Sequence, residues 1–235
     1  MKKLLIIKTG TTFATIRQKY GDFEDYIIDR TGMPASDVVV APVYIDKTLP
    51  PLTDVSAVII TGSHAMVTDR ADWSRRLAHW LRHMCGASVP VLGLCFGHQI
   101  LADAWGGAVD YHPRGQEVGT VEIELNEAGK KDPVLGCLPD KFLGHVYHAQ
   151  SVLELPPAAR PLARNAFEPH HAFVLHDNIW GVQFHPEFDA AVMLAYIEEE
   201  REALIREGFD VEKLQASLQD NSYGQLLLRR FVSLV

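Results

Sequence analysis

The first hundred residues of the chain alternate between short apolar runs and longer segments in which hydrophobic positions recur every three or four residues. In the short runs nearly every position is hydrophobic, which predicts strands buried on both faces of a parallel sheet. These runs cover residues 4–7, 37–44, 55–61 and 89–94. The pattern therefore predicts four core strands in this part of the chain.

The longer segments predict the helices that connect these strands. Hydrophobic positions at helical spacing indicate helices over residues 15–29, 73–84 and 96–105, with Asp72 as the N-cap of the second. Gly21 lies inside the first of these helices. Because strand and helix alternate, the crossovers are expected to be right-handed. We predict an α/β fold, a doubly wound, mostly parallel sheet flanked by helices.

The pattern changes after Gly107, where apolar and polar residues alternate. Residues 118–125 read VGTVEIEL, which is typical of an antiparallel strand with one buried face. Shorter strands are predicted at residues 142–148, 152–155, 160–165 and 171–175. We interpret this region as a small antiparallel β insert. After it come an apolar core strand and two helices, predicted over residues 180–184, 189–207 and 223–235.

Composition limits the classes of protein to consider. A chain of 235 residues is long enough for one α/β domain, so we predict a single domain over residues 1–235. The net charge of −8 argues against a nucleic-acid partner. No apolar stretch reaches the about 20 residues that a membrane helix needs, and we expect no membrane contact. The run over residues 4–7 is also too short for a signal peptide.

Cysteines and histidines add further expectations. The 3 cysteines, Cys85, Cys95 and Cys137, have spacings that suggest neither a disulfide framework nor a metal site. A reducing, cytoplasmic location fits this usage. The histidines show no metal-ligand spacing, and the sequence has no glycine-rich phosphate loop. We therefore predict neither a metal nor a cofactor.

Cys95 stands at the junction between a predicted strand and a predicted helix. Gly93 and Gly97 flank it, which allows the tight turn that lifts a nucleophile clear of a sheet. The helix that follows directs its free N–H groups and its positive dipole end toward the thiol, and this favours the thiolate. The alternative is that Cys95 is a small buried hydrophobic residue, so the interpretation depends on finding a base.

His185 and Glu187 supply that base. They follow the predicted strand over residues 180–184, and Pro186 between them favours an extended backbone at His185. Residues two apart in an extended segment face the same way, so the imidazole and the carboxylate are expected to lie side by side. A histidine that takes the thiol proton and an acid that orients the histidine form a Cys-His-acid triad.

Both segments resemble the signature blocks of class I (triad) glutamine amidotransferases. The likeness rests on GLCFGHQILADAWGG around Cys95 and GVQFHPE around His185, and it extends more loosely over most of the chain. The nearest relatives are the glutaminase part of GMP synthase and its stand-alone homologues. The resemblance implies the flavodoxin-like glutaminase fold. It also implies that Cys95 attacks the side-chain amide of glutamine, ammonia leaves, and water hydrolyses the γ-glutamyl thioester.

The resemblance also assigns residues around the triad. Gly62 lies where the family has its oxyanion strand. That strand is usually richer in glycine and proline in the family than it is here. A glycine at this position lets the main chain approach a ligand closely. We expect the N–H groups of Gly62 and Phe96 to form the oxyanion hole, and we interpret His64 as a rim residue. The positions that resemble the substrate-binding residues of relatives are Gln99, His148, Ala149 and Gln150.

Three hypotheses about function follow. The first is a glutaminase whose ammonia serves a separate ATP-dependent synthetase subunit, because these 235 residues hold no phosphate loop like that of the ATP-pyrophosphatase region of GMP synthases. The second is a γ-glutamyl peptidase, because the same thioester can form from any γ-glutamyl amide. The third is a non-catalytic module on the same fold, against which the intact Cys95, His185 and Glu187 argue.

Overall fold

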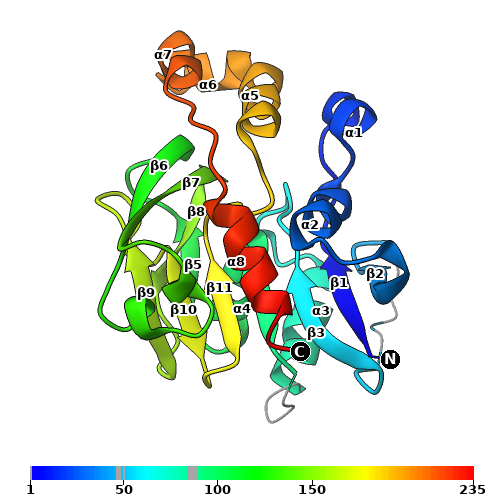
Figure 1. Ribbon diagram of the computed structural model, residues 1–235. Coiled ribbons are helices and arrows are strands. Elements are labelled where there is room, and N and C mark those ends of the chain that lie inside the picture. Colours follow the sequence, from blue (N-terminus) through cyan, green and yellow to red (C-terminus); the bar gives the residue numbers. More distant parts are fainter. Residues whose placement is uncertain (1, 46–48, 50, 84–88) are drawn as a thin grey trace.

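In the computed structural model, which describes residues 2–45, 49, 51–83 and 89–235, nine strands form one mixed sheet (Figure 1). The spatial order is β2 (Val38–Pro42), β1 (Lys3–Lys8), β3 (Val55–Ile60), β4 (Val91–Leu94), β11 (Ile179–Val182), β10 (Ala172–Leu175), β9 (Ala159–Arg164), β6 (Glu117–Leu125) and β7 (Lys141–His148). The first five strands run parallel, and the last four continue the sheet in antiparallel pairs. The carboxyl ends of β1, β3, β4 and β11 therefore lie at one edge.

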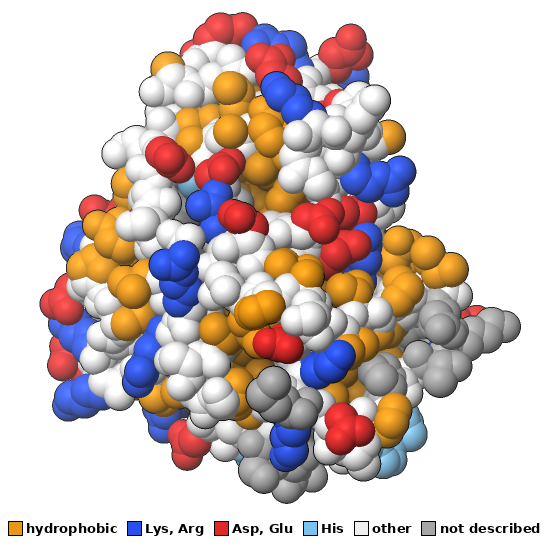
Figure 2. All heavy atoms as spheres, turned by 45° about the vertical axis from the view of Figure 1, so that its right-hand side comes forward, with side chains coloured by type: hydrophobic (Ala, Val, Ile, Leu, Met, Phe, Trp, Pro, Cys, Tyr) orange, Lys and Arg blue, Asp and Glu red, His pale blue; other side chains and the backbone are white. Residues whose placement is uncertain are grey.

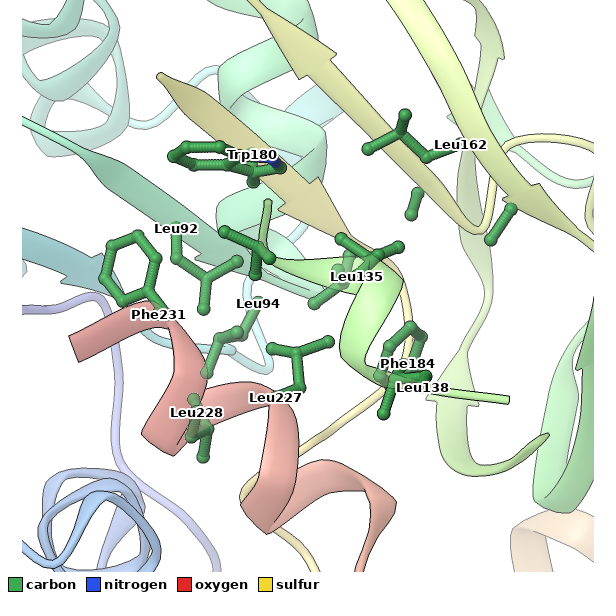
Figure 3. Packing of buried hydrophobic residues seen from close by; sticks show 14 of the residues in the cluster. Leu92, Leu94, Leu135, Leu138, Leu162, Trp180, Phe184, Leu227, Leu228 and Phe231 are labelled. Carbon is green, nitrogen blue, oxygen red and sulfur yellow. The ribbon is translucent and has the colours of Figure 1, made fainter. Parts of the chain in front are cut away.

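Helices cover both faces of the parallel half. α2 (Phe23–Thr31) and α8 (Tyr223–Val232) pack on one face, and α3 (Asp72–His83) and α4 (Phe96–Ala104) pack on the other. Strand β1 shows why both are needed, because Leu4 and Ile6 belong to one apolar cluster and Leu5 and Ile7 to the other. Figure 3 shows Leu227 and Phe231 of α8 lying next to Leu92 and Leu94 of β4.

The predicted α/β fold with flanking helices is confirmed, and the antiparallel region is more extensive than expected. Its strands do not form a detached insert, since β10, β9, β6 and β7 are hydrogen-bonded into the main sheet. A separate antiparallel pair joins β8 (Gln150–Glu154) to β5 (Ala108–Tyr111). The sequence pattern did not predict β5.

Two predicted helices are wrong as single elements. The helix predicted over residues 15–29 is divided into α1 (Ala14–Tyr20) and α2, because Gly21 has a φ of 92° and Asp22 caps α2. The helix predicted over residues 189–207 is divided into α5 (Ala190–Glu199) and α6 (Arg201–Arg206), with Asp189 as the N-cap of α5. Asp72 is the first helical residue of α3 and not its N-cap. Met84 and Cys85 lie outside the described residues.

Helices α1, α5, α6 and α7 (Val211–Ala216) form a cap above the sheet, at the top of the view in Figure 1. They pack around an apolar cluster that includes Ile16, Tyr196, Leu204 and Val211. The short 3-10 helices are η1 (Ala35–Asp37), η2 (Val67–Asp69), η3 (Gly129–Lys131) and η4 (Leu135–Cys137). Figure 2 shows acidic and basic side chains scattered together over one face of the molecule. No described helix is long and apolar enough to cross a membrane.

Candidate active site

Cys95 occupies a strained turn between β4 and α4. Its φ is 49° and its ψ is −99°, which is unusual for a residue with a side chain. The turn is held by a hydrogen bond of 2.9 Å from the Cys95 N–H to the Val182 carbonyl on β11. A methyl group on Gly93 would lie 2.4 Å from the Gly97 carbonyl, and one on Gly97 would lie 2.6 Å from the Ile60 carbonyl. Both glycines are therefore required by close backbone packing.

His185 lies just beyond β11 and is fixed from three sides. Its N–H donates to the His145 carbonyl at 2.8 Å, and its Nδ1 is 2.8 Å from Oε1 of Glu187. The ring of Phe188 stacks on the imidazole with 4.2 Å between ring centroids and 15° between planes. Only 5% of His185 and 1% of Glu187 is exposed. The imidazole is thus held in one orientation next to a buried carboxylate.

The surroundings of His185 favour its charged form. Burial alone would lower the pKa of the imidazole. The charges of Glu187 and Cys95 and a hydrogen bond to each of them act in the opposite direction and raise the pKa of His185 to about 10. The arrangement therefore supports an imidazolium at His185, between the Glu187 carboxylate and the side chain of Cys95.

Cys95 and His185 open into the same cavity of about 310 Å³, which is of the size of a small-molecule site. It lies at the edge where the parallel strands end, as ligand sites in open α/β sheets do. Its lining comes from the strand ends and the loop after β3, from α2 and α4, and, on the side of the cap, from Tyr196 and Glu200. The lining residues that the sequence predicted for the site are Cys95, Gln99, His148, Ala149, Gln150 and His185.

Gly62 borders His185 at the carboxyl end of β3. A methyl group on Gly62 would lie 3.0 Å from Cε1 of His185, so glycine leaves the imidazole its space. The hydroxyls of Thr9 and Thr61 both donate to the Gly62 carbonyl at 2.8 Å, which fixes this peptide. Phe96 is the first residue of α4, so its N–H has no partner within the helix. Their role as oxyanion donors stays a prediction.

The expected substrate-binding side chains are tied to one another. Gln99 donates through Nε2 to the Gln150 carbonyl at 2.7 Å and to Oε1 of Gln183 at 3.0 Å. Oε1 of Gln150 accepts a hydrogen bond of 3.1 Å from the Val67 N–H. These bonds hold α4 against β8 and η2. Ala149 also lines the cavity, and its carbonyl accepts a hydrogen bond of 2.9 Å from the His112 N–H.

His148 is likewise held from behind. Its Nδ1 lies 3.1 Å from the Gln150 carbonyl and its Nε2 lies 3.1 Å from Oε2 of Glu117, which is also 3.3 Å from Nε2 of His171. Burial alone would raise the pKa of Glu117, but the hydrogen bonds from His148 and His171 hold it well below its usual range. The carboxylate therefore anchors the strand that carries Tyr147 and His148. In the described part of the chain, no three histidine, cysteine, aspartate or glutamate side chains are arranged so that they could hold a metal ion.

Several lining residues were not predicted from the sequence. Aromatic side chains from the segment before α1, from α2, from β7 and from α5 line the cavity together with an acidic residue at the end of α5. They come from segments far apart in the chain and have no local motif, so only the fold brings them together. They are Phe13, Phe23, Tyr147, Tyr196 and Glu200. His64, interpreted as a rim residue, also lines the cavity.

Known proteins share the sequence pattern of this chain over much of its length. The family model for glutamine amidotransferase class-I matches residues 20–200. One subunit of the glutamine-hydrolyzing GMP synthase of Methanothrix thermoacetophila is 34% identical over 172 residues, which cover 72% of this chain and 84% of that protein. Gamma-glutamyl peptidase 4 of Arabidopsis thaliana is 28% identical over 151 residues, 60% of this chain and 57% of that protein. The chain spans 25%, 52% and 66% of the length of three further GMP synthase relatives.

Solved structures agree with the fold. A glutamine amidotransferase from Thermotoga maritima has a TM-score of 0.78 at 20% identity, with 99% of this chain and 97% of that chain covered. The likeness includes the mixed sheet and the flanking helices. Since the family model covers most of the chain and the fold agrees, this protein belongs to the class-I glutamine amidotransferases.

Proposed function

We propose that the protein hydrolyses the side-chain amide of glutamine through a γ-glutamyl thioester on Cys95. The observation that carries this proposal is the buried His185, hydrogen-bonded to Glu187 at 2.8 Å and paired with Cys95 in one cavity. In this arrangement Cys95 is the nucleophile, His185 transfers protons, and Glu187 orients and stabilises the imidazolium.

The first half of the reaction forms the thioester. The Cys95 thiolate attacks the γ-carbonyl carbon, and the N–H groups of Gly62 and Phe96 stabilise the oxyanion of the tetrahedral intermediate. The carbon–nitrogen bond then breaks while His185 gives its proton to the leaving nitrogen, and ammonia departs. The carbonyl of the intermediate re-forms as a thioester.

The second half releases glutamate. A water molecule gives a proton to the neutral His185 and attacks the thioester carbon. The carbon–sulfur bond breaks, glutamate leaves, and the thiolate and imidazolium are restored. We assign the glutamyl end of the substrate to Gln99, His148, Ala149 and Gln150, all of which line the cavity.

We further propose that the ammonia serves a separate ATP-dependent synthetase subunit. Support comes from relatives whose names describe each of them as one subunit of a GMP synthase, and therefore as part of a larger enzyme. The acceptor of the ammonia is then bound by the partner, and this chain supplies the glutaminase step.

A second candidate is hydrolysis of other γ-glutamyl amides, with an amine in place of ammonia. The relative named gamma-glutamyl peptidase 4 supports it, as does a cavity that extends from Cys95 to side chains of the cap. The thioester chemistry is identical in both cases, so the difference lies in the leaving group that the cavity accepts.

The test is turnover of the purified protein on glutamine and on a panel of γ-glutamyl dipeptides, with glutamate and ammonia or amine measured. We expect glutamate from glutamine, none from the Cys95→Ala variant, and unchanged activity in the matched Cys137→Ala variant. Preference for the dipeptides would put the second candidate first. Glutamine hydrolysis by Cys95→Ala would overturn both candidates.

A further inference from the structure

The cavity has two chemically different ends, and His185 marks one of them. In the proposed reaction the leaving nitrogen takes its proton from His185, so the leaving group lies on the side of this imidazole. The loop that follows β3 borders that side, because Gly62 packs against His185 and the charge of His185 acts on His64. Gln99 and Gln150 also line the cavity, and the hydrogen bond between them joins α4 to β8.

The leaving-group end is a wall of aromatic rings. The ring centroids of Phe13 and His64 are 4.4 Å apart, those of Phe13 and Tyr196 are 5.5 Å apart, and those of Tyr196 and Tyr147 are 5.7 Å apart. Each of these residues lines the cavity. Tyr196 belongs to α5, so the cap supplies part of this wall.

Ammonia does not use such a wall. It is small and strongly hydrated, whereas aromatic faces bind best to a ligand that removes apolar surface from water. A ring on the leaving amine would bury itself against Phe13 and Tyr196, in the offset or edge-to-face contacts that aromatic pairs favour. The wall therefore selects for a larger, apolar leaving amine.

The charge at the leaving-group end further limits which amines the cavity accepts. Glu200 lies one helical turn beyond Tyr196 on the same face of the cap and lines the cavity. Packing against Phe13 and Phe23 desolvates the ring of His64, and this effect and the charge of His185 lower the pKa of His64 below its usual value. Among the described lining residues there is no lysine or arginine. A carboxylate on the leaving group would meet Glu200, whereas the charge of His185 at this end is already paired with Glu187.

We propose that the preferred substrates are γ-glutamyl amides of amines that carry an aromatic ring and no carboxylate. The proposal rests on the thioester chemistry proposed for Cys95, follows the second candidate function and not the synthetase partner, and goes beyond it by naming the leaving group. The carbon–nitrogen bond breaks as described above, and the leaving amine takes the proton of His185 in place of ammonia. Phe13, His64 and Tyr196 contact the ring, and Glu200 excludes the acid.

The aromatic part is tested with γ-glutamyl benzylamide and γ-glutamyl methylamide, which differ by one phenyl ring. We expect kcat/KM to be about tenfold higher for the benzylamide, as for a partly buried ring. Phe13→Ala is expected to bring the ratio of the two kcat/KM values close to one. The control Tyr111→Ala truncates an exposed aromatic residue on β5 and is expected to leave kcat/KM for both amides unchanged. Equal rates on the two amides in the unmodified protein would overturn the proposal.

The charge part is tested with γ-glutamyl benzylamide and γ-glutamylphenylalanine, which share the phenyl ring and differ by a carboxylate. We expect the benzylamide to be preferred about tenfold at low salt, and Glu200→Gln to reduce that preference. A stronger preference for γ-glutamylphenylalanine in the unmodified protein would contradict the assignment of Glu200.

The proposed function and the proposed leaving group fail in different ways. If Cys95 forms no thioester, none of the amides, glutamine included, yields glutamate in a Cys95-dependent manner, and the proposed function fails. If the protein hydrolyses glutamine but not the benzylamide, the proposed function stands and the proposed leaving group is wrong. Intact-protein mass spectrometry after rapid quenching, which detects the γ-glutamyl adduct from either substrate, separates the two outcomes.

Discussion

The floor and the wall of the cavity are built in opposite ways. The floor consists of Cys95, His185 and Glu187, held at the ends of β4 and β11 by main-chain hydrogen bonds and by glycines that leave no room for a methyl group. The wall consists of the rings of Phe13, His64, Tyr147 and Tyr196, which touch through side chains alone. Floor residues lie at the ends of central strands, whereas the wall residues come from four separate places: the segment before α1, the loop after β3, β7 and α5.

This difference separates two functions of the site. A nucleophile and its base need fixed geometry within a fraction of an ångström, which a packed sheet edge supplies. Selection of a leaving group needs shape and polarity, which side chains on loops and elements around the sheet edge supply. Substitutions in the floor should therefore lower the turnover of every substrate, and substitutions in the wall should lower the turnover of only some substrates.

The largest effect is expected from Cys95→Ala. Loss of the nucleophile should lower kcat on every amide by at least about 10⁴-fold, because no thioester can form. Circular dichroism and the melting temperature should stay close to those of the unmodified protein, since the change removes one sulfur atom. Residual turnover within tenfold of the original rate would show that another group is the nucleophile.

Glu187→Gln should have the next largest effect. The amide keeps the size of the side chain but removes the charge that stabilises the imidazolium, so kcat should fall by about a hundredfold to a thousandfold. The raised pKa of His185 predicts that activity is lost as the pH rises through about 10, where His185 loses the proton that it gives to the leaving group. In Glu187→Gln this alkaline limit should move to lower pH. An unchanged pH profile would contradict the role of Glu187.

Gly97→Ala tests the packing of the floor. The added methyl group meets the Ile60 carbonyl at 2.6 Å, so β3 and α4 have to separate. We expect unfolding free energy to fall by about 2 kcal/mol and the melting temperature by roughly 4–8 °C. Calorimetry on the purified variant measures both. A melting temperature equal to that of the unmodified protein would show that α4 can move away from β3 without loss of stability.

Phe188→Leu sharpens the comparison between floor and wall. Phe188 stacks on His185 at 4.2 Å, and leucine keeps an apolar contact but loses the flat restraint on the imidazole. We expect kcat to fall by about tenfold for glutamine and for larger amides alike, with little change in KM. Loss of activity restricted to aromatic amides would instead place Phe188 in the wall.

The smallest effect is expected from Tyr196→Phe. The variant keeps the ring and loses the hydrogen bond of 2.6 Å between the Tyr196 hydroxyl and Oγ1 of Thr12. Stability should fall by about 1 kcal/mol, and kcat/KM on glutamine should stay within about twofold. Denaturant titration and steady-state kinetics check the two values. A large loss of glutamine turnover would mean that the cap takes part in the chemistry.

The sequence was most informative where local chemistry decides local structure. Glycines on both sides of Cys95 indicated the sharp turn, and Pro186 indicated that His185 and Glu187 face the same way. Both features depend on residues that are neighbours in the chain. For the same reason the core strands were predicted within a few residues of their observed bounds.

The sequence was least informative where distant segments meet. A continuous apolar stripe hid the break at Gly21, where a φ of 92° and the Asp22 cap end one helix and begin another. Phe13 and Tyr196 are 183 positions apart in the chain, and nothing near either residue indicates that their rings meet. The hydrogen bonds that hold His148 and Gln150 are equally non-local, since their partners lie on β6 and η2.

The most direct test of Cys95 as the nucleophile is labelling with a chloroketone analogue of glutamine, followed by peptide mass spectrometry. We predict one adduct, on Cys95, that forms faster than any on Cys85 or Cys137 and is prevented by glutamine. The half-buried Cys137 is a suitable internal reference, since burial raises the pKa of its thiol. Equal labelling of the three cysteines, or labelling of Cys95 that glutamine does not slow, would contradict the claim that Cys95 is the nucleophile of this site.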